Sequence, residues 1–130
     1  MKNAEERRID ESYMRMALSL ALRGTGTTSP NPRVGCVIVK NGEIIGKGWH
    51  RKYGGPHAEV EAAANASQDI CGADVYVTLE PCCHYGKTPP CAQMLAERKV
   101  KRVIIGTSDP NPLVDCKGIS VLEQAGITTE

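Results

Sequence analysis

A candidate set of metal ligands and a neighbouring carboxylate lie within residues 57–91 of this 130-residue chain. The ligands are His57, Cys82 and Cys91, and the carboxylate belongs to Glu59. Zn²⁺ prefers imidazole nitrogen and thiolate sulfur, and three protein ligands leave the fourth tetrahedral position open for water, as in catalytic sites. Glu59 follows His57 by two residues, so in the first turn of a helix its carboxylate can transfer protons near the metal without binding it. The pattern predicts one catalytic Zn²⁺ per chain.

Other residues of the same segment leave alternatives open. Cys83 is the main alternative ligand, although adjacent side chains diverge and it cannot readily bind a metal together with Cys82. His84 is a further candidate, but the predicted set already supplies three ligands. A closed structural zinc site would need a fourth ligand and would not need Glu59 where it stands. We therefore expect a catalytic site.

The composition favours one domain without a surface for nucleic acid or membrane. A chain of 130 residues that is 41% hydrophobic can bury a single core, so we expect one domain over residues 1–130, with residues 1–9 disordered. Sixteen basic and fifteen acidic residues give a net charge of +1, which attracts neither nucleic acid nor anionic lipid. The absence of Phe and the single Trp provide few rings for stacking on single strands.

The six cysteines are consistent with a reducing compartment. The first eight residues are charged, and no apolar signal-peptide core follows them, so the sequence predicts a cytoplasmic protein. No apolar run approaches the roughly 20 residues that a membrane-spanning helix needs. Metal binding therefore explains Cys82 and Cys91 better than disulfide formation does.

Hydrophobic periodicity predicts the elements that position these residues. A helix is expected to begin after Asp10 or Ser12 and to end near Gly24. Its apolar residues recur at three-and-four spacing and predict a core face: Tyr13, Met14, Ala17, Leu18, Ala21 and Leu22. Residues 34–39 and 44–49 predict two antiparallel strands joined by a turn at Asn41 and Gly42.

The zinc residues fall at the ends of the elements that follow. His57 lies in the N-terminal turn of a helix expected over 56–67, Cys82 follows a strand over 75–79, and Cys91 opens a helix over 92–98. A helix N-terminus is partly positive and favours ionised Glu59. The carboxyl ends of strands are where open α/β sheets commonly bind ligands. A strand over 103–106, a helix over 118–125 and at most a short final strand complete the chain.

The same residues match a known signature. H-x-E followed by P-C and a second Cys is typical of zinc-dependent nucleobase deaminases. The usual signature closes with P-C-x-x-C, whereas Cys82 and Cys91 are nine residues apart here. With TSPNPRVG at 28–35, GWH at 48–50, GGPHAE at 54–59 and DPNP at 109–112, this longer loop resembles the deaminase domains of the RibD family of bacterial riboflavin biosynthesis proteins. The resemblance runs from about residue 13 to the C-terminus.

The resemblance implies a fold and a reaction. The fold is a three-layer α/β/α arrangement of the cytidine deaminase type, with a central mixed sheet of four to five strands. The reaction is hydrolytic deamination of 2,5-diamino-6-(5-phosphoribosylamino)pyrimidin-4(3H)-one at C2, which gives 5-amino-6-(5-phosphoribosylamino)uracil and ammonia. Asn31, His50 and Lys87 are implied to contact the substrate. Without the resemblance, Asn31 would equally well hold a turn, and the other two would be surface residues.

The resemblance also bears on partners. Proteins of this family usually continue into a reductase that uses NADPH, and that half is missing from this sequence. We therefore expect no nicotinamide cofactor and a reductase that is either a separate chain or a further part of the protein. Deaminases of this fold commonly self-associate, so a homo-oligomer is expected by analogy.

Two other functions stay open from the sequence. A tRNA adenosine deaminase shares H-A-E and P-C, but it normally closes with C-x-x-C. A catalytically silent zinc-binding interaction module would keep the ligands without needing Glu59. The sequence does not assign roles to Cys83, His84, Asp109 or Asn111.

Overall fold

A mixed five-stranded sheet forms the centre of the computed structural model, which describes residues 3–24, 34–50, 57–79, 91–106 and 117–130. The strands are β1 (Gly35–Lys40), β2 (Glu43–Trp49), β3 (Asp74–Val77), β4 (Arg102–Ile105) and β5 (Thr128–Thr129). Their order is β2-β1-β3-β4-β5. β1 is antiparallel to both of its neighbours, and β3, β4 and β5 are parallel. The predicted mixed sheet is confirmed.

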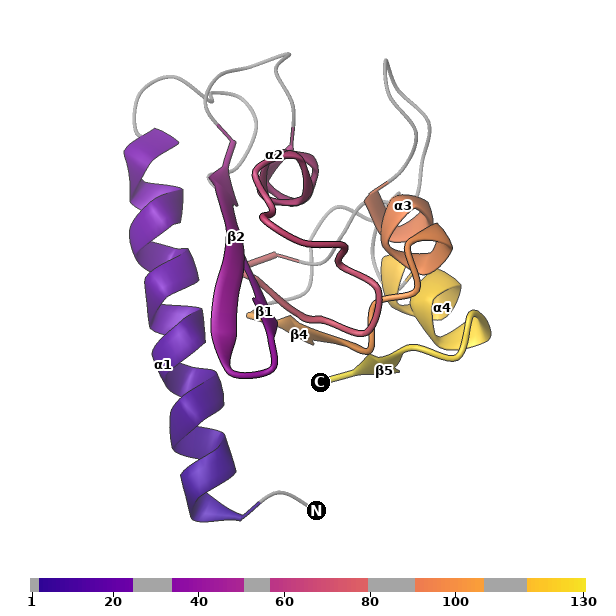
Figure 1. Ribbon diagram of the computed structural model, residues 1–130, viewed down its shortest axis with the longest axis horizontal. Coiled ribbons are helices and arrows are strands. Elements are labelled where there is room, and N and C mark those ends of the chain that lie inside the picture. The colour runs from indigo at the N-terminus through magenta and orange to yellow at the C-terminus, as the bar shows by residue number, and fades with distance from the viewer. Residues whose placement is uncertain (1–2, 25–33, 51–56, 80–90, 107–116) are drawn as a thin grey trace.

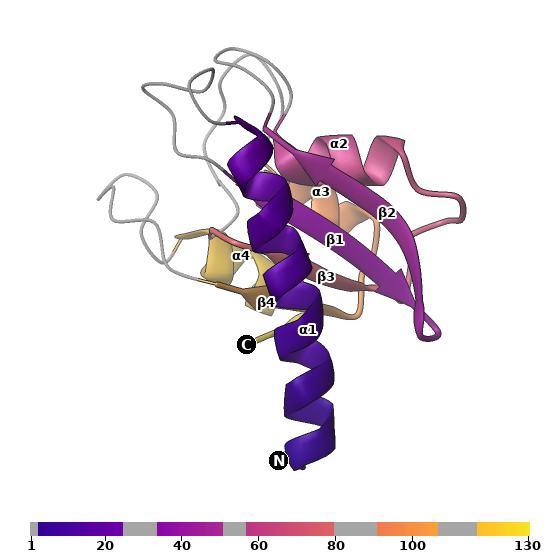
Figure 2. The ribbon, with the colours of Figure 1, turned by 90° about the vertical axis from the view of Figure 1, so that its left-hand side faces the viewer.

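Helices cover both faces of this sheet. They are α1 (Ala4–Ala21), the 3₁₀ turn η1 (Leu22–Gly24), α2 (Ala58–Ala64), α3 (Cys91–Glu97) and α4 (Lys117–Gln124). Among the described residues, α1 is the one helix on its face, where it packs on β1, β2 and β3, whereas α2, α3 and α4 lie on the other face (Figure 1; Figure 2). The expected three-layer α/β/α arrangement is therefore confirmed. None of these helices combines the length with the apolar character that crossing a bilayer demands.

The hairpin at the start of the sheet follows directly from its turn residues. Asn41 and Gly42 have φ angles of 52° and 79°. Positive φ at both central residues gives a two-residue turn whose twist matches that of the flanking strands, and Asn-Gly tolerates it best. β1 and β2 therefore pair as predicted, with a register shift between Ile38 and Val39.

Two clusters of buried side chains lie on the two faces of the sheet. The larger cluster lies under α2, α3 and α4 and includes Cys36, Ile38, Ile45, Ala58, Ala62, Ile70, Val75, Val77, Leu95, Val103 and Leu122. The smaller cluster lies under α1 and contains Ala17, Leu20, Val37, Val39, Tyr76 and Ile104. Alternate residues of β1 point into opposite clusters, as the period of two in a strand requires.

α1 begins earlier than its sequence predicts. The side chain of Asn3 caps the helix by accepting a hydrogen bond from the Glu6 backbone N–H at 2.8 Å. The helix then runs from Ala4, so the predicted start after Asp10 or Ser12 was wrong, and residues 4–9 of the segment expected to be disordered are helical. Asp10 lies inside the helix and is buried. An Asn cap followed by Glu in the first turn is a regular N-terminal signal that the sequence interpretation overlooked.

The buried face of α1 is also rotated from the predicted one. Ala17, Leu20 and Ala21 are buried, whereas Leu18 and Leu22 are 50% and 64% exposed. The reason lies in β1, where a Cβ added at Gly35 would come within 1.9 Å of the Ala17 carbonyl oxygen. The backbones approach so closely that only small side chains fit between them, so Ala17 and Ala21 take the contact positions and Leu18 and Leu22 turn outward.

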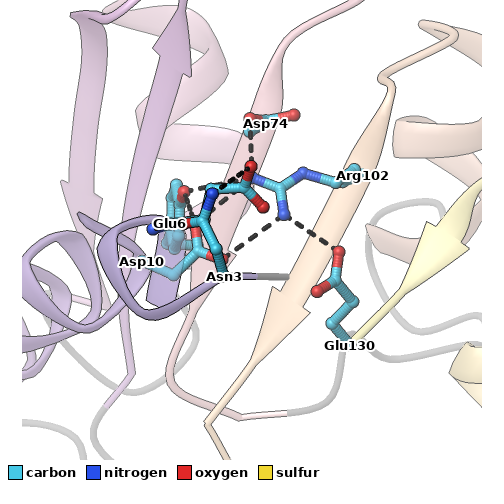
Figure 3. A network of polar contacts seen from close by, with 7 residues as sticks. Asn3, Glu6, Asp10, Asp74, Arg102 and Glu130 are labelled. Carbon is cyan, nitrogen blue, oxygen red and sulfur yellow. Dashed lines mark hydrogen bonds and ion pairs between the residues drawn. The ribbon is translucent and has the colours of Figure 1, made fainter. Parts of the chain in front are cut away.

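A polar network ties α1 to the parallel half of the sheet (Figure 3). The Arg102 guanidinium lies 2.9 Å from Asp74, 3.2 Å from Asp10 and 2.9 Å from Glu130. The Tyr76 hydroxyl donates a 2.5 Å hydrogen bond to Asp10. Burial raises the pKa of Tyr76 above its ordinary value, and this hydrogen bond raises it further. The network explains why a carboxylate is tolerated on the buried face of α1.

Candidate active site

Two of the predicted zinc ligands meet at the starts of two helices. His57 is the N-cap residue of α2, with φ −71° and ψ 161°, and Cys91 is the first residue of α3. The Nδ1 atom of His57 lies 3.2 Å from the sulfur of Cys91. Cys91 is buried and its thiol is not in a disulfide. The structure thus brings together two donor atoms that are 34 positions apart in the sequence.

The spacing of these donors fits a tetrahedral zinc ion. Bonds of about 2.0–2.1 Å to nitrogen and about 2.3 Å to sulfur, at the tetrahedral angle, place the two atoms about 3.5 Å apart. The observed 3.2 Å differs by only a few tenths of an ångström. The third predicted ligand, Cys82, lies outside the described residues. Across 3–24, 34–50, 57–79, 91–106 and 117–130, no group of three or more His, Cys, Asp or Glu is placed to hold a metal.

Glu59 points into the protein rather than into solvent. It lies in the first turn of α2, two residues after His57, and is 4% exposed. The thiol of Cys36 on β1 is fully buried, and burial raises its pKa. The negative charge of Glu59 raises the pKa of this thiol further. A buried carboxylate two residues after His57 is what the predicted proton-transfer role requires.

Two glycines of β2 let α2 lie against the sheet. A Cβ added at Gly48 would come within 2.5 Å of the Ala62 nitrogen and 2.6 Å of the Ala58 oxygen. One at Gly46 would come within 2.4 Å of the Ala62 oxygen. The sequence interpretation missed this role, although glycine at alternate positions of a strand indicates a close backbone approach. These glycines allow the close approach of α2, whose first turn carries Glu59, to β2.

His50 lies beside the predicted metal position. Its backbone N–H donates to the Val34 carbonyl at 3.0 Å, and the residue is only 3% exposed. Its ring meets that of His57 edge to face, with centroids 5.7 Å apart and planes at 88°. The sequence alone favours a surface histidine, and that interpretation was wrong. The location agrees with a residue that faces the site.

The end of β3, from which the chain enters residues 80–90, is held by hydrogen bonds to β1. The Gly35 N–H donates to the Thr78 hydroxyl at 3.2 Å, and the Thr78 N–H donates to the Gly35 carbonyl at 3.1 Å. Thr78 is buried. Sequence reasoning did not single out Thr78, because a Thr at a strand end carries no distinct chemical signal.

Several residues singled out from the sequence lie outside the described part of the chain. They are Asn31, Cys82, Cys83, His84, Lys87, Asp109 and Asn111. The roles predicted for Asn31, Cys82 and Lys87 therefore stay predictions.

Comparisons with known proteins support the resemblance noted in the sequence. The chain is 58% identical over 118 residues to the riboflavin biosynthesis protein RibD of Actinobacillus pleuropneumoniae, a match that covers 91% of this chain and 31% of that protein. A structure of Acinetobacter baumannii RibD superimposes with a TM-score of 0.92 at 52% identity and covers 96% of this chain and 35% of the other.

A third relative is named for two activities. It is the diaminohydroxyphosphoribosylaminopyrimidine deaminase/5-amino-6-(5-phosphoribosylamino)uracil reductase of Thermotoga maritima, with a TM-score of 0.92 and 45% identity. The match covers 95% of this chain and 36% of that protein. This chain thus spans about a third of the length of the relatives it matches. It resembles the deaminase domain of RibD, as predicted.

A family model for the zinc-binding region of these enzymes matches most of the chain. It is described as the cytidine and deoxycytidylate deaminase zinc-binding region and matches residues 7–107. The matched range includes His57, Glu59, Cys82 and Cys91. The chain therefore belongs to the family of cytidine and deoxycytidylate deaminase zinc-binding domains.

Proposed function

We propose that this chain is a zinc-dependent deaminase of riboflavin biosynthesis. It hydrolyses 2,5-diamino-6-(5-phosphoribosylamino)pyrimidin-4(3H)-one to 5-amino-6-(5-phosphoribosylamino)uracil and ammonia. The observation that carries the proposal is the 3.2 Å approach of His57 Nδ1 to the Cys91 sulfur beside buried Glu59. The names of the RibD relatives and of the Thermotoga enzyme support the choice of substrate.

The proposed ligands of one Zn²⁺ per chain are His57, Cys82 and Cys91. Nδ1 of His57 is the ring nitrogen that faces Cys91, so it is the atom that would bind the metal. Zinc in such a three-ligand site acts as a Lewis acid and lowers the pKa of a water in the open position to about 7.

Glu59 performs the proton transfers in this mechanism. Its carboxylate accepts a proton from the attacking water and delivers it to a ring nitrogen of the pyrimidine. A second proton from the same water then reaches the amino group at C2, the C2–N bond breaks, and ammonia leaves. One water is consumed for each ammonia released. Because Glu59 is 4% exposed, bulk water is kept from competing for these protons.

Substrate binding is assigned to Asn31, His50 and Lys87 from the family resemblance. The ring of His50 lies 5.7 Å from that of His57, close enough to contact a pyrimidine held at the metal. An amide such as that of Asn31 can both donate to and accept from a base, and the Lys87 ammonium supplies a cation for a phosphorylated substrate.

The reductase activity that accompanies deamination in the Thermotoga relative is assigned elsewhere, to a separate chain or a further domain. We therefore expect no binding of NADPH by this chain, and micromolar affinity for NADPH would contradict that expectation. A homo-oligomer and a cytoplasmic location are also proposed. Light scattering of the purified protein tests the first, because a monomeric mass would contradict it.

Ammonia release is the measurement that tests the proposed reaction. The protein is loaded with one equivalent of Zn²⁺ and incubated with the phosphoribosylaminopyrimidine or with an anticodon stem-loop RNA. We expect ammonia and the uracil product from the pyrimidine in equal amounts and no inosine in the RNA. Activity on RNA alone would make the chain a nucleic-acid deaminase, and zinc binding without any turnover would make it a silent zinc module.

A further inference from the structure

The only tryptophan of the chain is stacked against an arginine next to the site. The guanidinium carbon of Arg23, in η1, lies 4.9 Å from the centroid of the Trp49 ring, within the range of a cation–π interaction. Trp49 is the last residue of β2 and is half-buried, and Arg23 is exposed. The stack thus joins the turn that follows α1 to the end of β2.

That strand end carries His50. Successive residues of a strand point to opposite faces, and Gly48 faces α2, so Trp49 faces α1 and His50 returns to the side of α2. The ring of His50 then meets that of His57. The Arg23–Trp49 stack is therefore one residue from a proposed substrate contact, on the opposite face of the sheet.

Within the described part of the chain, β2 is an edge strand and is hydrogen-bonded to a neighbouring strand along one edge. It is the first strand in the order β2-β1-β3-β4-β5, so its ladder bonds go to β1 alone. At its end, Trp49 pairs with Gly35, and the His50 N–H donates to Val34. The contact of Arg23, in η1, with Trp49 adds support to this strand end from outside the ladder.

We propose that Arg23 and Trp49 are positioning residues whose stack fixes the end of β2 against η1, the turn that follows α1, and so holds His50 in place beside His57. This inference rests on the proposed function, in which His50 contacts the substrate. The groups that carry out the chemistry lie on other elements, because His57 and Glu59 stand at the start of α2 and Cys91 stands at the start of α3. Loss of the stack should therefore weaken substrate binding and leave turnover of bound substrate nearly unchanged.

The stack depends on the planar shape of the guanidinium as well as on its charge. Arginine stacks flat on an aromatic face, whereas the lysine ammonium is a compact point charge. Arg23→Ala should therefore remove the interaction, and Arg23→Lys should restore part of it. Arg15→Ala removes an exposed arginine from α1 and is the matched control for loss of charge.

Two measurements test the stack without any substrate. Because Trp49 is the sole tryptophan, the intrinsic fluorescence of the protein reports on this ring alone. We expect Arg23→Ala to increase quenching of Trp49 by acrylamide and to speed hydrogen exchange at the His50 amide about three- to fivefold, the range that a partly exposed cation–π interaction supplies. Arg15→Ala should change neither. Unaltered quenching and exchange in Arg23→Ala would overturn the proposal.

Steady-state kinetics then test the link to substrate binding. Arg23→Ala should raise KM for the phosphoribosylaminopyrimidine about three- to fivefold, with kcat within about twofold of the parent and zinc content unchanged. Arg23→Lys and Trp49→Phe should give intermediate values. An unchanged KM despite a disturbed Trp49 would overturn the positioning role. If the parent protein releases no ammonia, the proposed function has failed, and the exchange rate at His50 alone decides whether the stack positions this residue.

Discussion

The Nδ1 atom of His57 lies 3.2 Å from the sulfur of Cys91, and each residue stands at the start of its own helix. Neither helix exceeds seven residues, so their intrinsic stability is low and tertiary packing must hold them. α2 is held by its contact with the glycines of β2, and α3 packs against α4. The short distance between His57 and Cys91 therefore depends on tertiary packing across the whole α/β/α fold.

Glu59→Gln should abolish turnover and leave the zinc content unchanged. The amide keeps the size of the side chain but cannot accept a proton, so we expect kcat to fall by about 10²- to 10⁴-fold. Zinc content should remain at one equivalent, because Glu59 is not a proposed ligand. Glu123→Gln, at an exposed position of α4, is the control and should retain full activity. A Glu59→Gln enzyme with near-normal kcat would contradict the proton-transfer role.

Replacing cysteines one at a time should distinguish the zinc ligands from cysteines that do not bind the metal. Cys91→Ser and Cys82→Ser should each lower the zinc content measured after dialysis, because serine is a poor zinc ligand. Cys71→Ser is the control, since Cys71 is exposed in a turn between α2 and β3. Cys83→Ser should retain zinc. Loss of zinc in Cys83→Ser but not in Cys82→Ser would transfer the ligand role to Cys83.

Gly48→Ala should damage stability and metal binding together. The added methyl group would lie 2.5 Å and 2.6 Å from backbone atoms of α2, so the helix must move away from β2. We expect a loss of about 1–3 kcal/mol in the free energy of unfolding. Zinc affinity should fall as well, because His57 moves with α2. Lys47→Ala changes a neighbouring exposed position and is the control for thermal unfolding. An unchanged Tm and zinc affinity in Gly48→Ala would show that α2 tolerates the shift.

The protonated Tyr76 hydroxyl should stabilise the fold fully at pH values below the ordinary tyrosine pKa of about 10, and less at higher pH. Tyr76→Phe removes the hydrogen bond to Asp10 and should cost about 1–2 kcal/mol at pH 7. The pKa of Tyr76 is raised above the ordinary value of about 10, so both states keep the proton below that pH and the contribution is complete. At higher pH the unfolded chain loses its proton first, and the contribution declines.

Urea unfolding at several pH values from about 7 to 11 checks this sign. The free-energy difference between the parent and Tyr76→Phe should be constant up to about pH 10 and should then shrink. Tyr13→Phe is the control, because the Tyr13 hydroxyl donates a long, 3.4 Å hydrogen bond to the Gly42 carbonyl at an exposed position. A difference that grows with pH would contradict the account.

Local signals in the sequence were sufficient for most elements of the fold. The Asn41–Gly42 turn, the buried run of β1 and the placement of His57 at a helix start follow from backbone preferences that act over a few residues. The orientation of α1 could not be predicted in this way. It depends on the close approach of Ala17 to Gly35, and hydrophobic periodicity assigns more weight to Leu18 than to alanine.

In the candidate site too, some features could be predicted from local sequence and others depend on tertiary contacts. The types and spacing of His57, Glu59, Cys82 and Cys91 predict a zinc site. The structure places His57 and Cys91 close together, as that prediction requires. The burial of His50 was not predictable from its own neighbours, since it depends on the ring of His57 and the bond to Val34. Supporting contacts such as Arg23 on Trp49 join separate elements and leave no local pattern.

X-ray absorption at the zinc edge tests the central claim most directly. The proposed site predicts two sulfur ligands at about 2.3 Å, one nitrogen at about 2.0–2.1 Å and one exchangeable light atom in the parent protein. Cys91→Ser should lose one of the two sulfurs. Four protein ligands around the metal, or a spectrum that Cys91→Ser and a His57 replacement leave unchanged, would contradict an open catalytic site built on these residues.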